Sequence, residues 1–224
     1  MKPRAAQQDV MANMNISERL VAAEQFMRAI DNKMDGLSLD GEVRSRIFNG
    51  FLHLSLEHFG SIVLLMRSRM IASAAALLRP QYEAVMRGIY FYECATENEV
   101  ESFLHGKEPE KLYKMVGCIE EQFSIEKNPL TNIYSVLKKE MHSFTHGGFE
   151  QIHRRYTDTE LVSNYSEDEK TRLITVSHIL AIFAATFTAG VAGRDDLAVD
   201  FVAEVKKLAI TNQSSRSATP PADF

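Results

Sequence analysis

A run of twenty uncharged residues, 173–192, constrains the fold of this chain more than any other feature. Twenty residues are enough for an α-helix to cross a bilayer, but this run also contains Thr175, Ser177 and His178. Its alanines recur at four-residue spacing, which allows a neighbouring helix to approach closely. A helix that is hydrophobic on all sides is typical of the centre of a helical protein. We therefore predict a buried core helix here and expect no membrane span.

Helix start and stop signals divide the rest of the chain into further helices. Capping boxes, in which Asn, Thr or Ser is followed three residues later by Glu, begin at Asn15, Thr96 and Ser166. Asp40 and Asn128 are further predicted start points. Glycine and proline are scarce, at 11 and 6 of 224 residues, and no strand-like alternation competes with the helical periodicity. These patterns predict an all-α, single-domain bundle of about seven to eight helices with a largely buried penultimate helix.

Both ends of the chain are predicted to lie outside this bundle. We expect a flexible N-terminus at 1–14, the helical domain at 15–210 and a disordered tail at 211–224. The N-terminus lacks the apolar stretch of a signal peptide. Only two cysteines, Cys94 and Cys118, are present, so no disulfide framework is available. A cytoplasmic protein is therefore expected.

The helix predicted over residues 71–95 carries a row of charged side chains. Arg79, Glu83 and Arg87 recur at four-residue spacing and so lie on one face of a strongly apolar segment. Such a row is either a network that fixes helix packing or a site whose spare positive charge holds an anion. Pro80 lies inside the same helix and predicts a kink or a break, because proline removes one backbone donor.

A second polar cluster follows about sixty residues later, at the predicted end of a helix before two glycines. The two histidines in it are one helical turn apart, and the negative end of a helix favours an imidazolium. If the chain is an enzyme, His146 is the predicted acid or base, with Arg79 and Glu83 completing the catalytic set. An ordinary polar helix end is the alternative. The cluster comprises His142, Ser143, His146, Gln151 and Arg154.

Metal and cofactor chemistry find little support in these residues. The spacing of His142 and His146 suits one metal ion, but Ser143 stands where the zincin signature requires Glu. No glycine-rich phosphate loop or nucleophile elbow is present in the sequence. We therefore predict neither a metal nor a cofactor.

Together the two clusters resemble a family of uncharacterised bacterial all-helical proteins. The segments LLRPxxEAxxRG and SFTHxGxxQ of that family are represented here at residues 77–88 and 143–151. The resemblance extends over about residues 43–190 and implies no activity. It implies that one shared feature contains Arg79, Glu83, Arg87, Ser143, His146 and Gln151.

A looser similarity connects the chain with HEPN-like helical domains, some of which cleave RNA as dimers without a metal. Their motif Arg-Asn-x-x-x-His-Gly is matched at His146 and Gly147, but Met141 stands in place of the arginine. Arg46 and His53 show a related Arg and His spacing on another predicted helix. The similarity implies a ribonuclease only if a neighbouring helix supplies the missing cation.

Three functions are therefore open. The favoured one is binding of a nucleotide, another small anion or a nucleic-acid phosphate, with a homodimer expected. The second is a HEPN-like, metal-independent ribonuclease, a toxin or phage-defence component acting on RNA. The third is a structural or interaction protein without a ligand. The formal charge of −5 argues against broad duplex binding, which needs a positive field. The predicted ligand-binding residues are Arg79, Glu83, Arg87, His142, Ser143, His146, Gln151 and Arg154.

Overall fold

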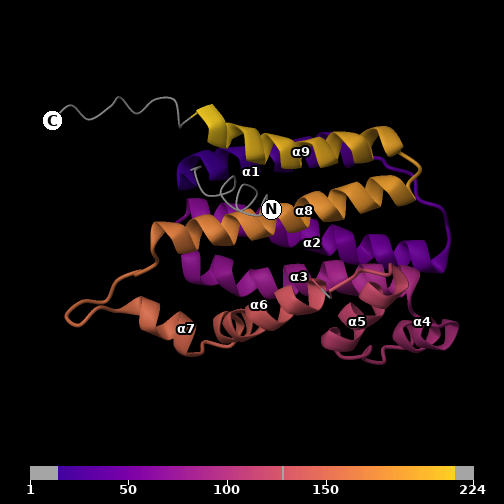
Figure 1. Ribbon diagram of the computed structural model, residues 1–224, viewed down its shortest axis with the longest axis horizontal. Helices are drawn as coiled ribbons and strands as arrows, with labels where there is room; N and C mark the ends of the chain where they lie inside the picture. The colour runs from indigo at the N-terminus through magenta and orange to yellow at the C-terminus, as the bar shows by residue number, and fades with distance from the viewer. Residues whose placement is uncertain (1–14, 128, 215–224) are drawn as a thin grey trace, which may run out of the picture.

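The protein is a bundle of α-helices (Figure 1). A computed structural model describes residues 15–127 and 129–214, so the predicted N-terminal segment 1–14 lies outside the described residues. Within these ranges eight helices have eight residues or more, and no strand is present. The predicted all-α bundle is confirmed. In chain order the helices are α1 (Ile16–Met34), α2 (Val43–Arg67), α3 (Ile71–Glu93), α4 (Glu97–Leu104), α5 (Leu112–Gln122), α6 (Pro129–Thr145), the short α7 (Phe149–Ile152), α8 (Glu167–Val191) and α9 (Asp195–Ser214).

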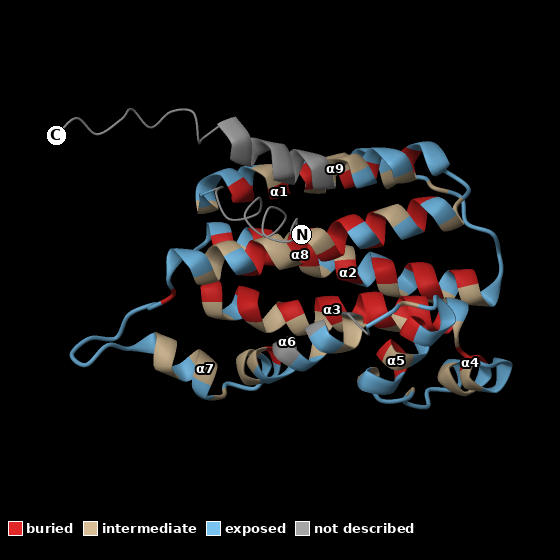
Figure 2. Ribbon diagram, viewed as in Figure 1, coloured by how far each residue is buried: buried red, intermediate tan, exposed pale blue. Residues whose placement is uncertain are grey.

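The helices are arranged in layers around α3 and α8. The most extensive packing joins α2 to α3, and α8 lies against both of them. On one side α1 and α9 cover α8, and on the other α5 and α6 cover α3 (Figure 1). Buried residues gather on α2, α3 and α8, whereas α4 and α7 are mostly exposed or intermediate (Figure 2). The two polar clusters of the sequence therefore lie at the edge of one core, the first on α3 and the second at the end of α6 and in the residues that follow it.

The penultimate helix α8 is largely buried, as predicted. By length and composition it meets the criterion for a membrane span, with a mean hydropathy of 1.8 in its most apolar window. However, 56% of that window is buried inside the bundle, which is typical of the core helix of a soluble protein. It is the one helix of this kind in the part of the chain that the structure describes.

A buried pair of hydrogen bonds fixes how α3 and α8 pack. The Gln81 side chain donates from Nε2 to the Ser177 carbonyl at 2.8 Å, and the Ser177 hydroxyl donates to Gln81 Oε1 at 2.7 Å. Both side chains are fully buried. Because an unpaired buried amide is costly, only one register of the two helices satisfies both residues.

Pro80 does not break its helix. The α3 helix is continuous from Ile71 to Glu93, so a break there is excluded. Proline leaves the Ala76 carbonyl without its intrahelical donor. The Thr145 hydroxyl, at the end of α6, lies 3.4 Å from that carbonyl oxygen. A polar group of α6 thus lies beside the site where the proline opens the hydrogen-bond ladder of α3.

The predicted start points of the helices are correct where a capping box is present. Asn15, Thr96 and Ser166 each accept a hydrogen bond from the backbone of the Glu three residues later, and each Glu bonds back. The prediction of Asp40 as a cap is wrong, because Glu42 occupies that position and Asp40 instead accepts from the Ser45 hydroxyl at 3.0 Å.

The end of the chain departs from its predicted boundary. The α9 helix continues to Ser214, four residues into the predicted tail. The rest of that tail, 215–224, lies outside the described residues.

Candidate functional site

The charged row on α3 is half-buried. Arg79 Nε donates to Glu83 Oε1 at 2.7 Å, and Arg87 Nη2 lies 3.5 Å from Glu83 Oε2. Exposed fractions of the three side chains are 31%, 20% and 27% in chain order. The row is therefore neither a solvated surface ladder nor a fully buried network. Since one carboxylate serves two guanidinium groups, one positive charge is left unmatched within the row.

The histidine pair of α6 meets this row. Arg79 Nη1 lies 2.9 Å from His142 Nδ1. Because a guanidinium can only donate, Nδ1 must accept, which places the proton of the neutral His142 ring on Nε2. The ring centroids of His142 and His146 are 4.6 Å apart. Arg79, His142 and His146 thus form one connected group, although Arg79 and His142 are 63 residues apart in sequence.

Tyr134 and Lys138 extend the same group and were not predicted. The Tyr134 ring stacks on Tyr82 of α3 at 6.2 Å, and Lys138 Nζ lies 5.8 Å from the Tyr134 ring centroid. Burial raises the pKa of Tyr134, Arg79 lowers it and Glu83 raises it, so its hydroxyl lies in the field of the row. A sequence signal existed, because both residues continue the four-residue spacing of the two histidines along α6. We call the complete group the α3–α6 cluster; it comprises Arg79, Glu83, Arg87, Tyr134, Lys138, His142 and His146.

Ser143 and the two glycines have structural tasks at the end of α6. The Ser143 carbonyl accepts from the Gly148 amide at 2.7 Å, and its hydroxyl accepts from the Glu150 amide at 2.9 Å. Gly147 has a φ of 64°, in the left-handed region that favours glycine. A Cβ atom on Gly148 would lie 2.6 Å from the Ser143 hydroxyl oxygen. These residues form the tight turn that leads from α6 into α7.

Gln151 ties that turn to α3. Its side-chain Nε2 donates to the Ala72 carbonyl at 3.1 Å. Ala72 belongs to the first turn of α3, whereas Arg79 lies about two turns further along. Gln151 therefore links the turn after α6 to the first turn of α3. This contact is about two helical turns along α3 from Arg79, which contacts His142.

Arg154 has partners other than the α3–α6 cluster. Its Nε donates to Glu169 Oε1 at 2.7 Å and its Nη1 to Glu150 Oε2 at 2.9 Å. Its guanidinium also lies over the rings of Phe144 and Tyr165, at 5.4 and 5.8 Å. Burial lowers the pKa of Arg154, but the bonds to both carboxylates outweigh it, so the net effect is a raised pKa. Two carboxylates, those of Glu150 and Glu169, pair with its positive charge. Because Glu169 is in the first turn of α8, Arg154 links the segment after α7 to the start of α8.

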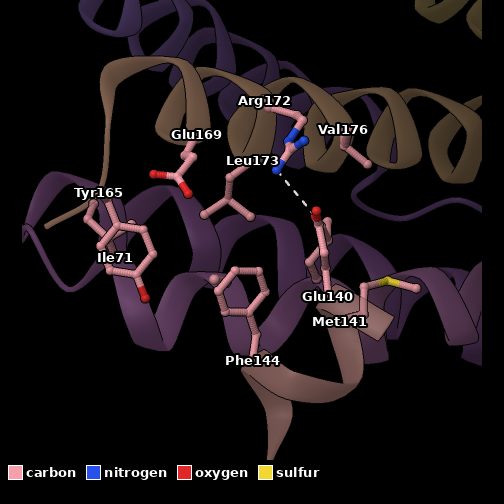
Figure 3. Close-up of a pocket in the computed structure, with 11 residues that line it drawn as sticks. Ile71, Glu140, Met141, Phe144, Tyr165, Glu169, Arg172, Leu173 and Val176 are labelled. Atoms are coloured by element: carbon pink, nitrogen blue, oxygen red, sulfur yellow. Dashed lines mark hydrogen bonds and ion pairs between the residues drawn. The ribbon is translucent and has the colours of Figure 1, made fainter. Parts of the chain in front are cut away.

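A small cavity lies next to these aromatic rings (Figure 3). Its volume is about 40 Å³, and an ion pair of 3.2 Å between Arg172 and Glu140 lies beside it. The Tyr165 hydroxyl is buried without a hydrogen-bond partner among the described residues. A cavity of this size accommodates water and is too small for a nucleotide. The α3–α6 cluster, which faces solvent, is therefore the better candidate site.

Neither Arg46 nor His53 belongs to the cluster. Both lie on α2, and both are exposed. In the described part of the chain, no group of three or more His, Cys, Asp or Glu residues has the arrangement of a metal site.

Gly148→Ala tests whether the end of α6 is a structural turn. We expect a loss of about 1–3 kcal/mol in the free energy of unfolding, because the new methyl group would collide with the Ser143 hydroxyl and with its Cα at 3.1 Å. Urea denaturation of the purified protein measures this. Gly117→Ala is the matched control, since no atom lies within 4 Å of its Cβ position in α5. An equal loss in both variants would contradict the proposed close contact.

These features define an all-α protein with a partly exposed Arg, Lys and His cluster between two helices. The chain matches a family of unknown function, DUF6988, over residues 52–209, which is more than two thirds of its length, and it belongs to that family. The matched range contains the whole α3–α6 cluster. No curated protein and no solved structure matches the chain. Membership of an uncharacterised family is thus confirmed, whereas the similarity to HEPN-like domains stays a prediction.

Proposed function

We propose that the α3–α6 cluster binds a small phosphate-bearing anion, such as a nucleotide. One observation carries this proposal: the polar residues around His146 form hydrogen bonds, whereas the His146 ring contacts His142 but forms no hydrogen bond with any described residue. Ser143 and Gln151 bond to backbone groups, but no hydrogen bond to the His146 ring nitrogens is present among the described residues. His146 is exposed, next to His142 and Arg79. An exposed histidine whose ring nitrogens form no hydrogen bond with the protein is suited to contact a ligand.

The donors of the cluster suit an anion. Arg79, Arg87 and Lys138 are cations, and the Arg79 contact leaves His142 with an Nε2–H donor. The one carboxylate, Glu83, is already bound to both arginines. Arginine and lysine are the side chains that proteins use most for phosphate, because their N–H groups make charge-assisted hydrogen bonds with its oxygens.

A solvent-facing location favours a ligand that brings several negative charges. Exposed ion pairs are weak singly, so binding needs two or more contacts at once. A di- or triphosphate can reach Arg79 and Arg87, which are two helical turns apart, while a third oxygen contacts His146. We therefore expect the affinity to fall steeply with added salt and to be greater for ATP than for AMP.

Calorimetric titration with ATP and AMP tests the proposal. His146→Ala should weaken ATP binding about tenfold by removing one charge-assisted contact. Because His146 is exposed, the melting temperature should stay that of the wild type. His53→Ala, which removes an exposed histidine from α2, is the matched control and should change nothing. Undiminished ATP binding by His146→Ala, or none by the wild type, would contradict the proposal.

A ribonuclease is the second candidate, favoured by the proximity of the two histidine rings. Metal-independent cleavage of RNA needs a general base, a general acid and a cation near the phosphate. His142, His146 and Arg79 provide these groups within one connected set. Incubation of RNA with the wild type and with His146→Ala, in the presence of a chelator, separates cleavage from binding. Cleavage by the wild type but not by His146→Ala would favour the ribonuclease. Sedimentation would test the homodimer that we expect in solution.

A further inference from the structure

An apolar groove lies next to the α3–α6 cluster and has no part in it. Its volume is about 880 Å³, within the range of ligand-binding pockets. The α3 helix supplies Tyr82 and Met86 to its lining, and further lining residues come from α5, α6 and α8. Asn132 and Tyr82 are the two polar residues among the described residues that line it. The groove is thus built for a ligand with a large apolar body.

Three aromatic rings at the groove are exposed to solvent. Phe183 and Phe187 of α8 are 52% and 37% exposed, and their rings stack at 6.3 Å with an angle of 17° between planes. Phe123, which follows α5, is 48% exposed. Apolar surface of this extent marks a binding site when it surrounds a concave hollow. Because the faces of aromatic rings attract cations, the groove also favours a positively charged guest.

An acidic recess adjoins the groove at Ile125, a residue that lines both hollows. Glu120, Glu121 and Glu126 line the recess, which has a volume of about 400 Å³. Glu120 is bonded to the start of α6, but Glu121 and Glu126 are exposed and form no ion pair with any described residue. None of the described residues lining either hollow is Lys or Arg. The recess therefore places negative potential at the end of an aromatic groove.

We propose that this groove and recess together bind a lipophilic cation, an organic molecule with an apolar, preferably aromatic body and a positive charge. The apolar body fits the groove between α3 and α8, and the charge is attracted by Glu121, Glu126 and the aromatic faces. A neutral guest would leave the recess without a role. A second copy of the chain, docked groove to groove, would bring two such acidic recesses together, which is unfavourable.

This cation site is independent of the proposed anion site. The anion cluster uses Arg79, Glu83 and Arg87, none of which lines the groove, whereas the groove takes Tyr82, Met86 and Ile89 from the same helix. The Tyr82–Tyr134 stack lies between them. Loss of one binding activity in a variant therefore need not affect the other.

Two probes of the same shape and opposite charge test the proposal on the full chain. Tetraphenylphosphonium and tetraphenylborate each carry four phenyl rings, so they differ mainly in the sign of their charge. We expect calorimetric titration to show that the phosphonium binds about tenfold more tightly than the borate. Equal affinities, tighter binding of the borate, or no binding of the phosphonium would overturn the proposal.

Variants then locate the site. Phe183→Gln should weaken phosphonium binding about tenfold, whereas Leu64→Gln, which removes an exposed apolar side chain from α2, should not. The double variant Glu121→Gln and Glu126→Gln should remove most of the preference for the cation, and Glu57→Gln on α2 should retain it. Unchanged binding in Phe183→Gln, or an unchanged preference in the double variant, would place the probe elsewhere and overturn the assignment. Sedimentation of the wild type checks the alternative occupant, because a stable dimer that excludes the phosphonium would also overturn it.

Discussion

Acidification from about pH 7 to about pH 5 should cost the folded protein about 2 kcal/mol through His178 alone. The His178 side chain is 3% exposed and lies between the rings of Phe26 and Phe59, at centroid distances of 4.9 and 5.3 Å. Its Nε2 has no hydrogen-bond partner among the described residues. Burial and, to a lesser extent, the nearby positive charge of Arg19 lower the pKa of His178 to about 4.

The direction of the effect follows from proton binding in the two states. An unfolded histidine has a pKa of about 6.5, so between pH 6.5 and about 4 the unfolded chain binds a proton that the native protein does not. The contribution of neutral His178 is complete above pH 6.5 and is lost as the pH falls towards 4. Over that whole range the loss is about 3 kcal/mol.

A variant without the imidazole isolates this contribution. His178→Leu replaces the imidazole with an apolar side chain of similar size that does not titrate. Between about pH 7 and about pH 5, its free energy of unfolding should fall by about 2 kcal/mol less than that of the wild type, as measured by urea denaturation. His58→Gln is the control, because burial also lowers the pKa of His58, but its side chain is only half-buried. If the wild type and His178→Leu lose the same stability, His178 is not the group responsible.

The helices of this protein were predictable because their signals are local. Each capping box needs only four consecutive residues, and the boxes at Asn15, Thr96 and Ser166 are present as expected. The burial of α8 likewise follows from one uncharged segment. Asp40 failed as a prediction because several polar residues precede α2, and the sequence does not show which of them the backbone will place at the cap.

The assembly of the candidate site was not predictable from spacing alone. Spacing placed Arg79 and Glu83 on one face, and His142 and His146 on another, but the contact between α3 and α6 depends on tertiary packing. The catalytic hypothesis and the family resemblance suggested that these segments form one feature, but spacing could not show it. For Arg154, the spacing does indicate one ion-pair partner, Glu150, four residues earlier. It does not indicate the other, Glu169, which belongs to a different helix.

Glu120 is a further residue that local signals do not reveal. It belongs to α5, is 4% exposed and binds the start of α6. Its Oε1 accepts from the backbone amides of Leu130 and Thr131 at 2.6 and 3.0 Å. The Thr131 hydroxyl donates to its other oxygen. The first turn of α6 is therefore capped by a residue ten positions earlier in the chain. Asn128, the start point that the sequence predicted for this helix, lies outside the described residues.

Glu120→Ala should lower the free energy of unfolding by about 3 kcal/mol. The substitution leaves two amides at the start of α6 without their acceptor, and hydrogen bonds to a charged group contribute about 1.5–3 kcal/mol each. The burial of the carboxylate keeps water from replacing it fully. Urea denaturation measures the loss, and faster hydrogen exchange in the first turn of α6 should accompany it.

Two variants distinguish the cap from a general effect on α5. Glu120→Gln retains an amide oxygen for Leu130 and Thr131 but removes the charge, so we expect about half the loss. Glu121→Ala removes the neighbouring exposed carboxylate and should be nearly neutral, since alanine is a good helix former. If Glu121→Ala were as destabilising as Glu120→Ala, the loss would come from charge or helix propensity in α5. Since His142 lies on α6 and His146 directly follows it, a destabilised first turn in Glu120→Ala should also weaken ATP binding without altering any residue of the α3–α6 cluster.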